Sequence, residues 1–169
     1  QMCIRDRYKG YYKGVFPVKV NQQAQVIDRI VDFGKDFDFG LEVGSKPELL
    51  IALAHDLSSE STIICNGIKD KEFINLAILS LKIGFKTILV LESPRELDLI
   101  TEVSEELNVR PLLGIRVKLT NKVSGNWSQS SGDRSAFGMS VEQVMKVITK
   151  LKVNNYLDCL VLQHSHLGS

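Results

Sequence analysis

The sequence predicts an α/β protein built as an incomplete (β/α)8 TIM-type barrel of about six βα units. Short apolar runs rich in β-branched residues alternate with longer amphipathic stretches, which is typical of a parallel sheet covered by helices. The predicted strands begin roughly every 25 residues, as in successive βα units. Nothing in the spacing indicates the reversal of strand order that an open, doubly wound sheet requires. These observations together favour a barrel.

Three βα units are predicted in the first half of the chain. Their strands cover residues 15–20, 37–43 and 61–65, and their helices cover residues 24–34, 46–55 and 70–83. The first helix is indicated by apolar residues at helical spacing, and Gly34 marks its end. Ser45 is the predicted N-cap of the second helix, because Glu48 completes a capping box three residues later. Gly84 stands directly behind the third helix.

The second half of the chain continues this alternation but contains one long polar stretch. Its strands are predicted over residues 87–91, 111–117 and 157–163, and its helices over residues 93–107 and 140–151. Ser93 and Pro94 begin the first of these helices, because proline is favoured in a first helical turn. Residues 120–135 are too polar for a core, and loops of this length are usually functional.

The composition excludes several classes of protein. The 169 residues include 21 basic and 20 acidic side chains and are 44% hydrophobic, which is the balance of a globular protein. We expect no nucleic-acid partner, because the charges form no basic block. We also expect no membrane partner, because no apolar run reaches the roughly 18 residues of a spanning helix. Cys3, Cys65 and Cys159 form neither a disulfide framework nor a metal-binding pair, so we expect a cytoplasmic protein.

The two ends of the chain carry unusual sequences. Residues 1–7 have no periodicity that joins them to the first strand, and we interpret them as derived from a sequencing adapter. The chain stops at Ser169, directly after the sixth strand and a turn that resembles a functional one. We therefore expect residues 8–169 to form the N-terminal part of a barrel domain.

Every predicted strand is followed by a polar side chain at its carboxyl end, which is where parallel α/β folds bind ligands. In chain order these residues are Lys19, Asn21, Glu42, Asn66, Glu92, Arg116, His164 and His166. Arg116 is the most informative of them, because a guanidinium between Ile115 and Val117 needs an anionic or hydrogen-bond-accepting partner inside the barrel.

Several of these residues also have simpler interpretations. A lysine at a strand end, such as Lys19, is more often a solvated charge at the rim than a catalytic group. Glu42 and Glu92 are suited to capping the helices that follow them, and for Glu92 we favour this interpretation. We expect only one of His164 and His166 to face the barrel mouth, and therefore no metal site that uses both.

A lysine, an arginine, a carboxylate and a histidine around one barrel mouth suit a cofactor with an aldehyde, a phenolate and a phosphate. Pyridoxal phosphate has these groups. Lys19 would bind it through a Schiff base, Arg116 would lie by the phenolate, and an imidazole would stack on the ring. Gly168 and Ser169 follow the sixth strand and suit a phosphate group.

Segments in the same order along the chain resemble the bacterial biosynthetic arginine decarboxylases, which have the alanine-racemase-like pyridoxal phosphate fold. They are residues 14–23 (GVFPVKVNQQ), 40–46 (GLEVGSK), 65–70 (CNGIKD), 113–116 (LGIR), 137–138 (FG) and 164–169 (HSHLGS). The segment around Lys19 is specific, because the related decarboxylases of ornithine, diaminopimelate or carboxynorspermidine have different flanks. Asn126 and Ala136 depart from the resemblance, since lysine usually stands at both positions.

The resemblance implies a lyase that decarboxylates L-arginine to agmatine and carbon dioxide in polyamine and spermidine biosynthesis. Lys19 would hold pyridoxal phosphate, and His166 would stack on the pyridine ring as the second catalytic residue. Arg116 would approach the phenolic oxygen, Glu42 would lie near the lysine, and Ser169 would lie near the phosphate. The resemblance also implies magnesium and a homo-oligomer in the full-length protein.

Three alternatives remain open at this point. The chain could belong to a regulatory or carrier protein that binds pyridoxal phosphate without turnover, or to a phosphate-binding barrel enzyme that uses Lys19 otherwise. It could also belong to a decarboxylase of ornithine, diaminopimelate or carboxynorspermidine. We expect residues 1–169 alone to be inactive and marginally folded, because an open barrel leaves strand edges unpaired.

Overall fold

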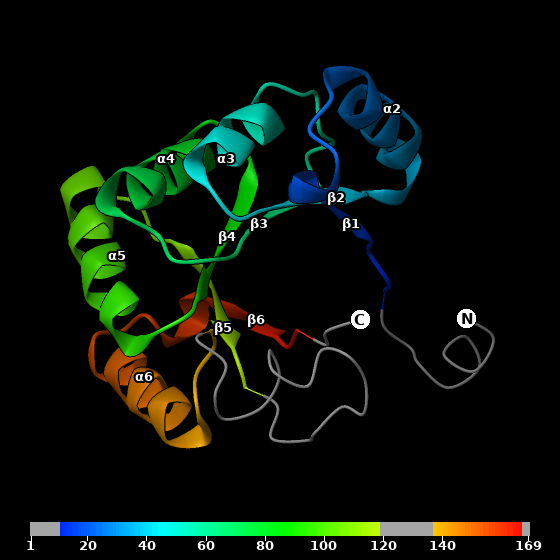
Figure 1. Ribbon diagram of the computed structural model, residues 1–169. Coiled ribbons are helices and arrows are strands. Elements are labelled where there is room, and N and C mark those ends of the chain that lie inside the picture. The colour runs from blue at the N-terminus through cyan, green and yellow to red at the C-terminus, as the bar shows by residue number, and fades with distance from the viewer. Residues whose placement is uncertain (1–10, 119–136, 167–169) are drawn as a thin grey trace, which may run out of the picture.

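The computed structural model describes residues 11–118 and 137–166, which form a curved parallel sheet with helices on its outer side (Figure 1). The strands are β1 (Val15–Pro17), β2 (Gly40–Val43), β3 (Thr62–Cys65), β4 (Lys86–Leu91), β5 (Leu112–Arg116) and β6 (Leu160–His164). Each strand pairs in parallel with the next one along the chain. This order without reversal is that of a partial barrel and confirms the predicted fold class.

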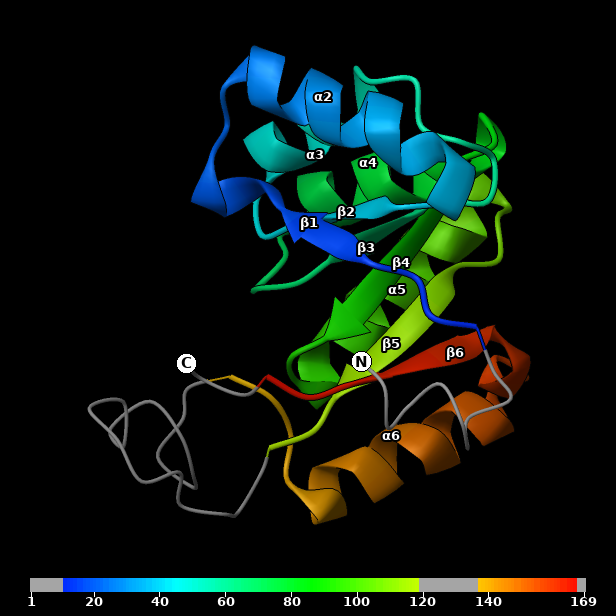
Figure 2. The same ribbon diagram turned by 90° about the vertical axis from the view of Figure 1, so that its right-hand side faces the viewer.

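The helices connect successive strands and lie in an arc outside the sheet (Figure 1). They are α2 (Ala24–Gly34), α3 (Lys46–Leu53), α4 (Lys71–Lys82), α5 (Pro94–Leu107) and α6 (Val141–Val153), together with the 3-10 turns η1 (Val18–Val20), η2 (Lys35–Phe37) and η3 (Leu157–Cys159). Figure 2 shows the strands side by side, from β1 to β6. In the described part of the chain, no helix is long and apolar enough to cross a membrane.

Local capping explains where the helices begin. The Ser45 side chain accepts the Glu48 N–H at the start of α3, which confirms Ser45 as N-cap. The Glu48 carboxylate does not complete the predicted capping box, because it accepts the N–H of Gly44 (2.8 Å), one residue before the cap. At α6, Ser140 and Gln143 form the complete reciprocal box.

Five of the six predicted strands are shorter in the structure than the sequence indicates, and three of them differ from the prediction by three residues at one end. The strand predicted over residues 15–20 ends at Pro17, and Lys19 lies on the 3-10 turn η1. Proline carries no N–H for a further ladder hydrogen bond, which favours the end of the strand at this point. The strands predicted from residues 37 and 157 begin at Gly40 and Leu160, because η2 and η3 occupy the residues before them. The predictions for residues 1–7 and 120–135 lie outside the described residues.

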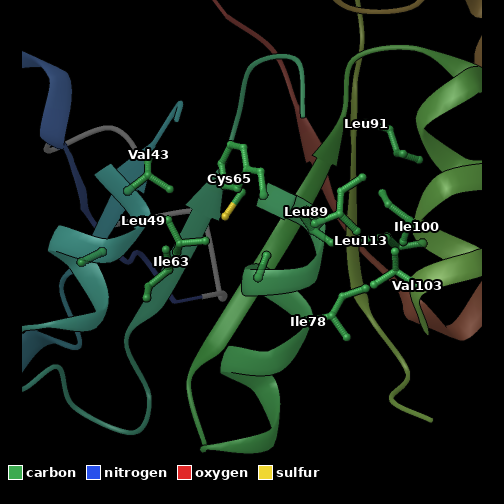
Figure 3. Close-up of a cluster of buried hydrophobic side chains, with 14 of the residues drawn as sticks. Val43, Leu49, Ile63, Cys65, Ile78, Leu89, Leu91, Ile100, Val103 and Leu113 are labelled. Carbon is green, nitrogen blue, oxygen red and sulfur yellow. The ribbon is translucent and has the colours of Figure 1, made fainter. Parts of the chain in front are cut away.

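The apolar core lies between the sheet and the helices (Figure 3). Strand residues that point to the helices are fully or nearly fully buried, and among them are Val43, Ile63, Cys65, Leu89, Leu91 and Leu113. They contact helix residues such as Leu49, Ile78, Ile100 and Val103. Cys65 is a buried free thiol, and burial raises its pKa to about 12. Alternate strand residues point to the opposite, inner face of the sheet.

Candidate functional site

Polar side chains gather at the carboxyl ends of the strands, on the inner face of the sheet. Glu42 lies between Leu41 and Val43, which are both buried on the helix side, so Glu42 points inward. Arg116 on β5 is the register partner of His164 on β6. Glu92 directly follows β4 and bonds to Arg116, so three neighbouring strands deliver polar groups to one place.

Glu42 is held at this edge by Asn66, from the turn after β3. The Asn66 side-chain N–H donates to Glu42 Oε1 (2.8 Å), and the Asn66 backbone N–H donates to Val43 O (2.8 Å). The other side-chain atom of Asn66, Oδ1, is buried and has no hydrogen-bond partner in the described part of the chain. Glu42 is therefore bonded to the turn after β3, whereas Ser45 caps α3. The buried acceptor beside Glu42, Asn66 Oδ1, has no hydrogen-bond partner among the described residues.

Glu92 accepts hydrogen bonds from three separate segments. Its Oε1 accepts from the Gly67 N–H (3.0 Å) and from Arg116 Nη1 (2.9 Å), and its Oε2 accepts from the Gly138 N–H (3.0 Å). The interpretation of Glu92 as a helix cap is therefore wrong. The carboxylate is the anionic partner that Arg116 requires inside the barrel.

The Arg116 guanidinium is held on two sides. Glu92 bonds its Nη1, and the ring of Phe137 lies 5.3 Å from its central carbon, which is within range of a cation–π contact. The side chain is 16% exposed, so it lies at the edge of the core rather than in open solvent. The prediction that Arg116 has an anionic or hydrogen-bond-accepting partner is confirmed, and the partner is the Glu92 carboxylate.

The two histidines lie together. Their ring centroids are 6.3 Å apart, because residues two positions apart share one face of an extended chain. The expectation that only one of them faces the barrel mouth is therefore wrong. Burial and the nearby charge of Arg116 lower the pKa of His164, so its imidazole is mainly neutral near pH 7. His164 Nδ1 is buried and finds no hydrogen-bond partner within the described residues, whereas His166 is exposed.

The sequence did not predict the buried ion pair between Lys69, in the turn after β3, and Glu96, in the first turn of α5. The Lys69 side chain is fully buried, and its ammonium lies 3.2 Å from Glu96 Oε1 and donates to Gly67 O (2.5 Å) and Val90 O (2.7 Å). Glu96 also accepts the backbone N–H groups of Lys69 and Glu92. A lysine between Ile68 and Asp70 is indistinguishable from a solvated loop residue in the sequence, so only the fold reveals this pair.

Lys19 and Lys69 differ in what their amines can do. The Lys69 ammonium donates to two backbone carbonyl groups and forms a buried ion pair with Glu96, so this amine is structural. Lys19 is exposed on η1, two residues after the register partner of Glu42, and has no hydrogen-bond or ion-pair partner among the described residues. Lys19 is therefore at the correct edge of the sheet, although no bond joins it to Glu42 or Arg116. Ser169 lies outside the described residues.

The residues at this edge fit pyridoxal phosphate. The acceptor Asn66 Oδ1 and the ring atom His164 Nδ1 are both buried without partners in the part of the chain that the structure describes. Buried polar atoms nearly always have a hydrogen-bond partner, so two such atoms without one at the same edge indicate a place for a ligand. Arg116 supplies a fixed cation for an anionic oxygen, and Lys19 supplies a primary amine for an aldehyde.

Comparisons with known proteins agree with this geometry. A family model described as "Pyridoxal-dependent decarboxylase, pyridoxal binding domain" matches residues 4–169. The biosynthetic arginine decarboxylase of Gloeobacter violaceus is 49% identical over 162 residues, which are 96% of this chain and 25% of that protein. Arginine decarboxylase 2 of Arabidopsis thaliana is 46% identical over 164 residues, covering 96% of this chain and 23% of that protein. The chain thus spans about a quarter of the length of these curated relatives.

Solved structures show the same architecture. The biosynthetic arginine decarboxylase of Campylobacter jejuni superposes with a TM-score of 0.83 at 34% identity, over 96% of this chain and 25% of that one. A diaminopimelate decarboxylase of M. jannaschii has a TM-score of 0.73 at 24% identity, over 98% of this chain and 37% of that one, and shows the fold alone. The partial barrel is therefore an arrangement already known from complete enzymes.

Proposed function

Because the chain belongs to the pyridoxal-dependent decarboxylase family, we propose that it forms part of the cofactor-binding barrel of an arginine decarboxylase. The reaction proposed for the whole protein is the conversion of L-arginine to agmatine and carbon dioxide. One observation carries the proposal: two buried polar atoms without partners among residues 11–118 and 137–166 and a fixed arginine lie at the same sheet edge as Lys19. The names of the relatives from Gloeobacter violaceus and Arabidopsis thaliana support arginine as the substrate.

In this proposal the cofactor is held by Lys19, Glu42, Arg116, His166 and Ser169. When bound, pyridoxal phosphate supplies a conjugated ring that stabilises the negative charge left on Cα as carbon dioxide departs. The Lys19 amine is the covalent attachment point, because the Lys69 amine is buried and held by two carbonyl groups and Glu96.

The other side chains orient the ligand and manage protons. Arg116, paired with Glu92, donates N–H groups to an anionic oxygen without adding a full net charge to the site. Glu42 uses Oε1 to accept from Asn66, which leaves Oε2 as the oxygen that can accept a proton. His164 presents a neutral ring, since its pKa is lowered by burial and by Arg116.

The test is Lys19→Ala in the full-length protein, compared with Lys13→Ala. These two lysines flank β1, and Lys13 pairs with Asp38 at the opposite end of the strand. We expect Lys19→Ala to abolish the absorbance of covalently bound cofactor and agmatine formation, while Lys13→Ala keeps both. Retention of both by Lys19→Ala would contradict the proposal.

The same experiment separates the alternatives. A regulatory or carrier protein would show the cofactor absorbance and release no carbon dioxide from any amino acid. A phosphate-binding enzyme that uses Lys19 otherwise would show no cofactor that borohydride fixes to the chain. Assays with ornithine, diaminopimelate and carboxynorspermidine, run beside arginine, identify a decarboxylase of another substrate.

Further expectations rest on the composition and on the resemblance rather than on the geometry of the site. We propose a cytoplasmic homo-oligomer that serves polyamine and spermidine biosynthesis, without a nucleic-acid or membrane partner, and with residues 1–169 inactive by themselves. Residues 11–118 and 137–166 contain no group of three or more His, Cys, Asp or Glu side chains that could hold a metal ion. We therefore assign no step to magnesium.

A further inference from the structure

Glu92 joins three parts of the site that are far apart in the sequence. It is 5% exposed and accepts from the turn after β3, from the end of β5 and from the residue that precedes Met139. A buried carboxylate is unfavourable unless it is paired and hydrogen-bonded, and Glu92 meets both conditions. Each of these hydrogen bonds therefore fixes the position of a group at the carboxyl edge of the sheet, where we place the cofactor.

The largest constraint falls on Arg116. An arginine side chain loses much rotational freedom when a ligand fixes it, and that loss weakens binding. Glu92 and the Phe137 ring already fix the guanidinium before any ligand arrives. A Cβ at Gly138 would lie only 3.2 Å from Arg116 Cγ, so the backbone also approaches this side chain closely. Arg116 is preorganised by its surroundings.

We propose that Glu92 is a positioning residue, which acts through Arg116 to set the affinity of the site for pyridoxal phosphate. The inference rests on the proposed function, because it assumes that Arg116 meets an anionic oxygen of this cofactor. Glu92 itself touches the guanidinium and backbone N–H groups, and it contributes to binding only by holding them.

A double-mutant cycle tests whether Glu92 acts through Arg116. The four full-length proteins are the wild type, Glu92→Gln, Arg116→Gln and the double variant, and the measurement is the Kd of the apo protein for pyridoxal phosphate. A glutamine cannot accept from all three donors, because its NH2 group would face an N–H. We expect Glu92→Gln to weaken binding about tenfold or more when Arg116 is present. In the Arg116→Gln background we expect the same change to weaken binding less than about threefold.

Additive losses would overturn the proposal, because a role that is only structural weakens binding equally in both backgrounds. Val103→Ala is the control for lost stability, since Val103 is fully buried in α5 away from the site, and we expect its Kd to equal that of the wild type. If Glu92→Gln does not fold, Glu92→Asp replaces it in the cycle, with the negative charge kept and the reach shortened. If the wild-type protein does not bind pyridoxal phosphate, the proposed function itself fails, and this outcome is distinct from additivity.

Discussion

Ion pairs occur at both ends of the sheet, but they differ in burial. At the amino ends, the pairs Lys13–Asp38, Lys86–Glu60 and Arg110–Asp158 are exposed. At the carboxyl ends, the pairs Lys69–Glu96 and Arg116–Glu92 are buried, whereas the pairs of Lys46 with Asp70 and Glu72 are exposed. Exposed pairs contribute little to stability because water screens them, whereas buried pairs must first lose their hydration. The described ion pairs in which both side chains are buried thus lie at the carboxyl edge, where they build a rigid, charged site.

The buried pairs are retained because backbone groups complete their hydrogen bonding. Two carbonyl groups accept from Lys69, and two backbone N–H groups donate to Glu92. Such fully bonded charges are typical of places where a protein needs a fixed electrostatic environment. The burial of these two ion pairs thus indicates that the carboxyl edge of the sheet is the functional edge, and this inference needs no relative.

The largest effect is expected from Lys69→Met in the full-length protein. Methionine keeps an unbranched side chain but leaves Glu96 as an unpaired buried charge and leaves Gly67 O and Val90 O without the Lys69 donor. We expect the free energy of unfolding to fall by about 3–5 kcal/mol, measured by urea denaturation. A loss below about 1 kcal/mol would mean that the buried and exposed pairs are equivalent.

An intermediate effect is expected from two matched glycine substitutions, one at each edge. Gly67 (φ +75°) follows β3, and Gly84 (φ +98°) precedes β4. Alanine at Gly84 meets no atom within 4 Å, so only the left-handed backbone opposes it, by roughly 1–2 kcal/mol. Alanine at Gly67 would also lie 3.0 Å from Gly44 O, so we expect a greater loss of stability. Equal losses, compared by thermal unfolding, would show that the carboxyl edge is no more rigid than the amino edge.

The smallest effect is expected from Lys86→Met, which breaks the exposed pair with Glu60. Both side chains are largely solvated, so the free energy of unfolding should change by less than about 1 kcal/mol. Added salt should reduce even this difference, because it screens exposed charges. Urea denaturation at low and high salt measures both quantities, and a loss as large as that of Lys69→Met would remove the distinction between the edges.

Much of the fold could be predicted from local patterns. The helix from Pro94 to Leu107 agrees with the prediction at its end and begins one residue after the predicted Ser93, because the preference for proline in a first turn and helical periodicity are encoded within a few residues. The beginnings of β2 and β6 were less well predicted, since 3-10 turns and strands share the same apolar residues there. For Lys19, the pattern gave its place at a strand end but not its position on η1.

The candidate site could be predicted in part. Arg116 indicated by itself that it needs an anion, because an apolar strand surrounds it. The partner is Glu92, and the order of neighbouring strands could have identified it, since β4 lies beside β5. Its three donors come from residues 67, 116 and 138, and no local pattern relates positions so far apart.

The sequence by itself determined the alternation of strands and helices, the edge at which polar groups collect, and Lys19 as the reactive amine to consider. These properties depend on periodicity and on residue type, which a linear chain displays directly. Only the tertiary structure decided which carboxylate pairs with Arg116 and that Lys69 is buried. It also decided that Asn66 Oδ1 and His164 Nδ1 are buried without a hydrogen-bond partner among the described residues. Burial and pairing are properties of neighbours in space, and folding alone brings those neighbours together.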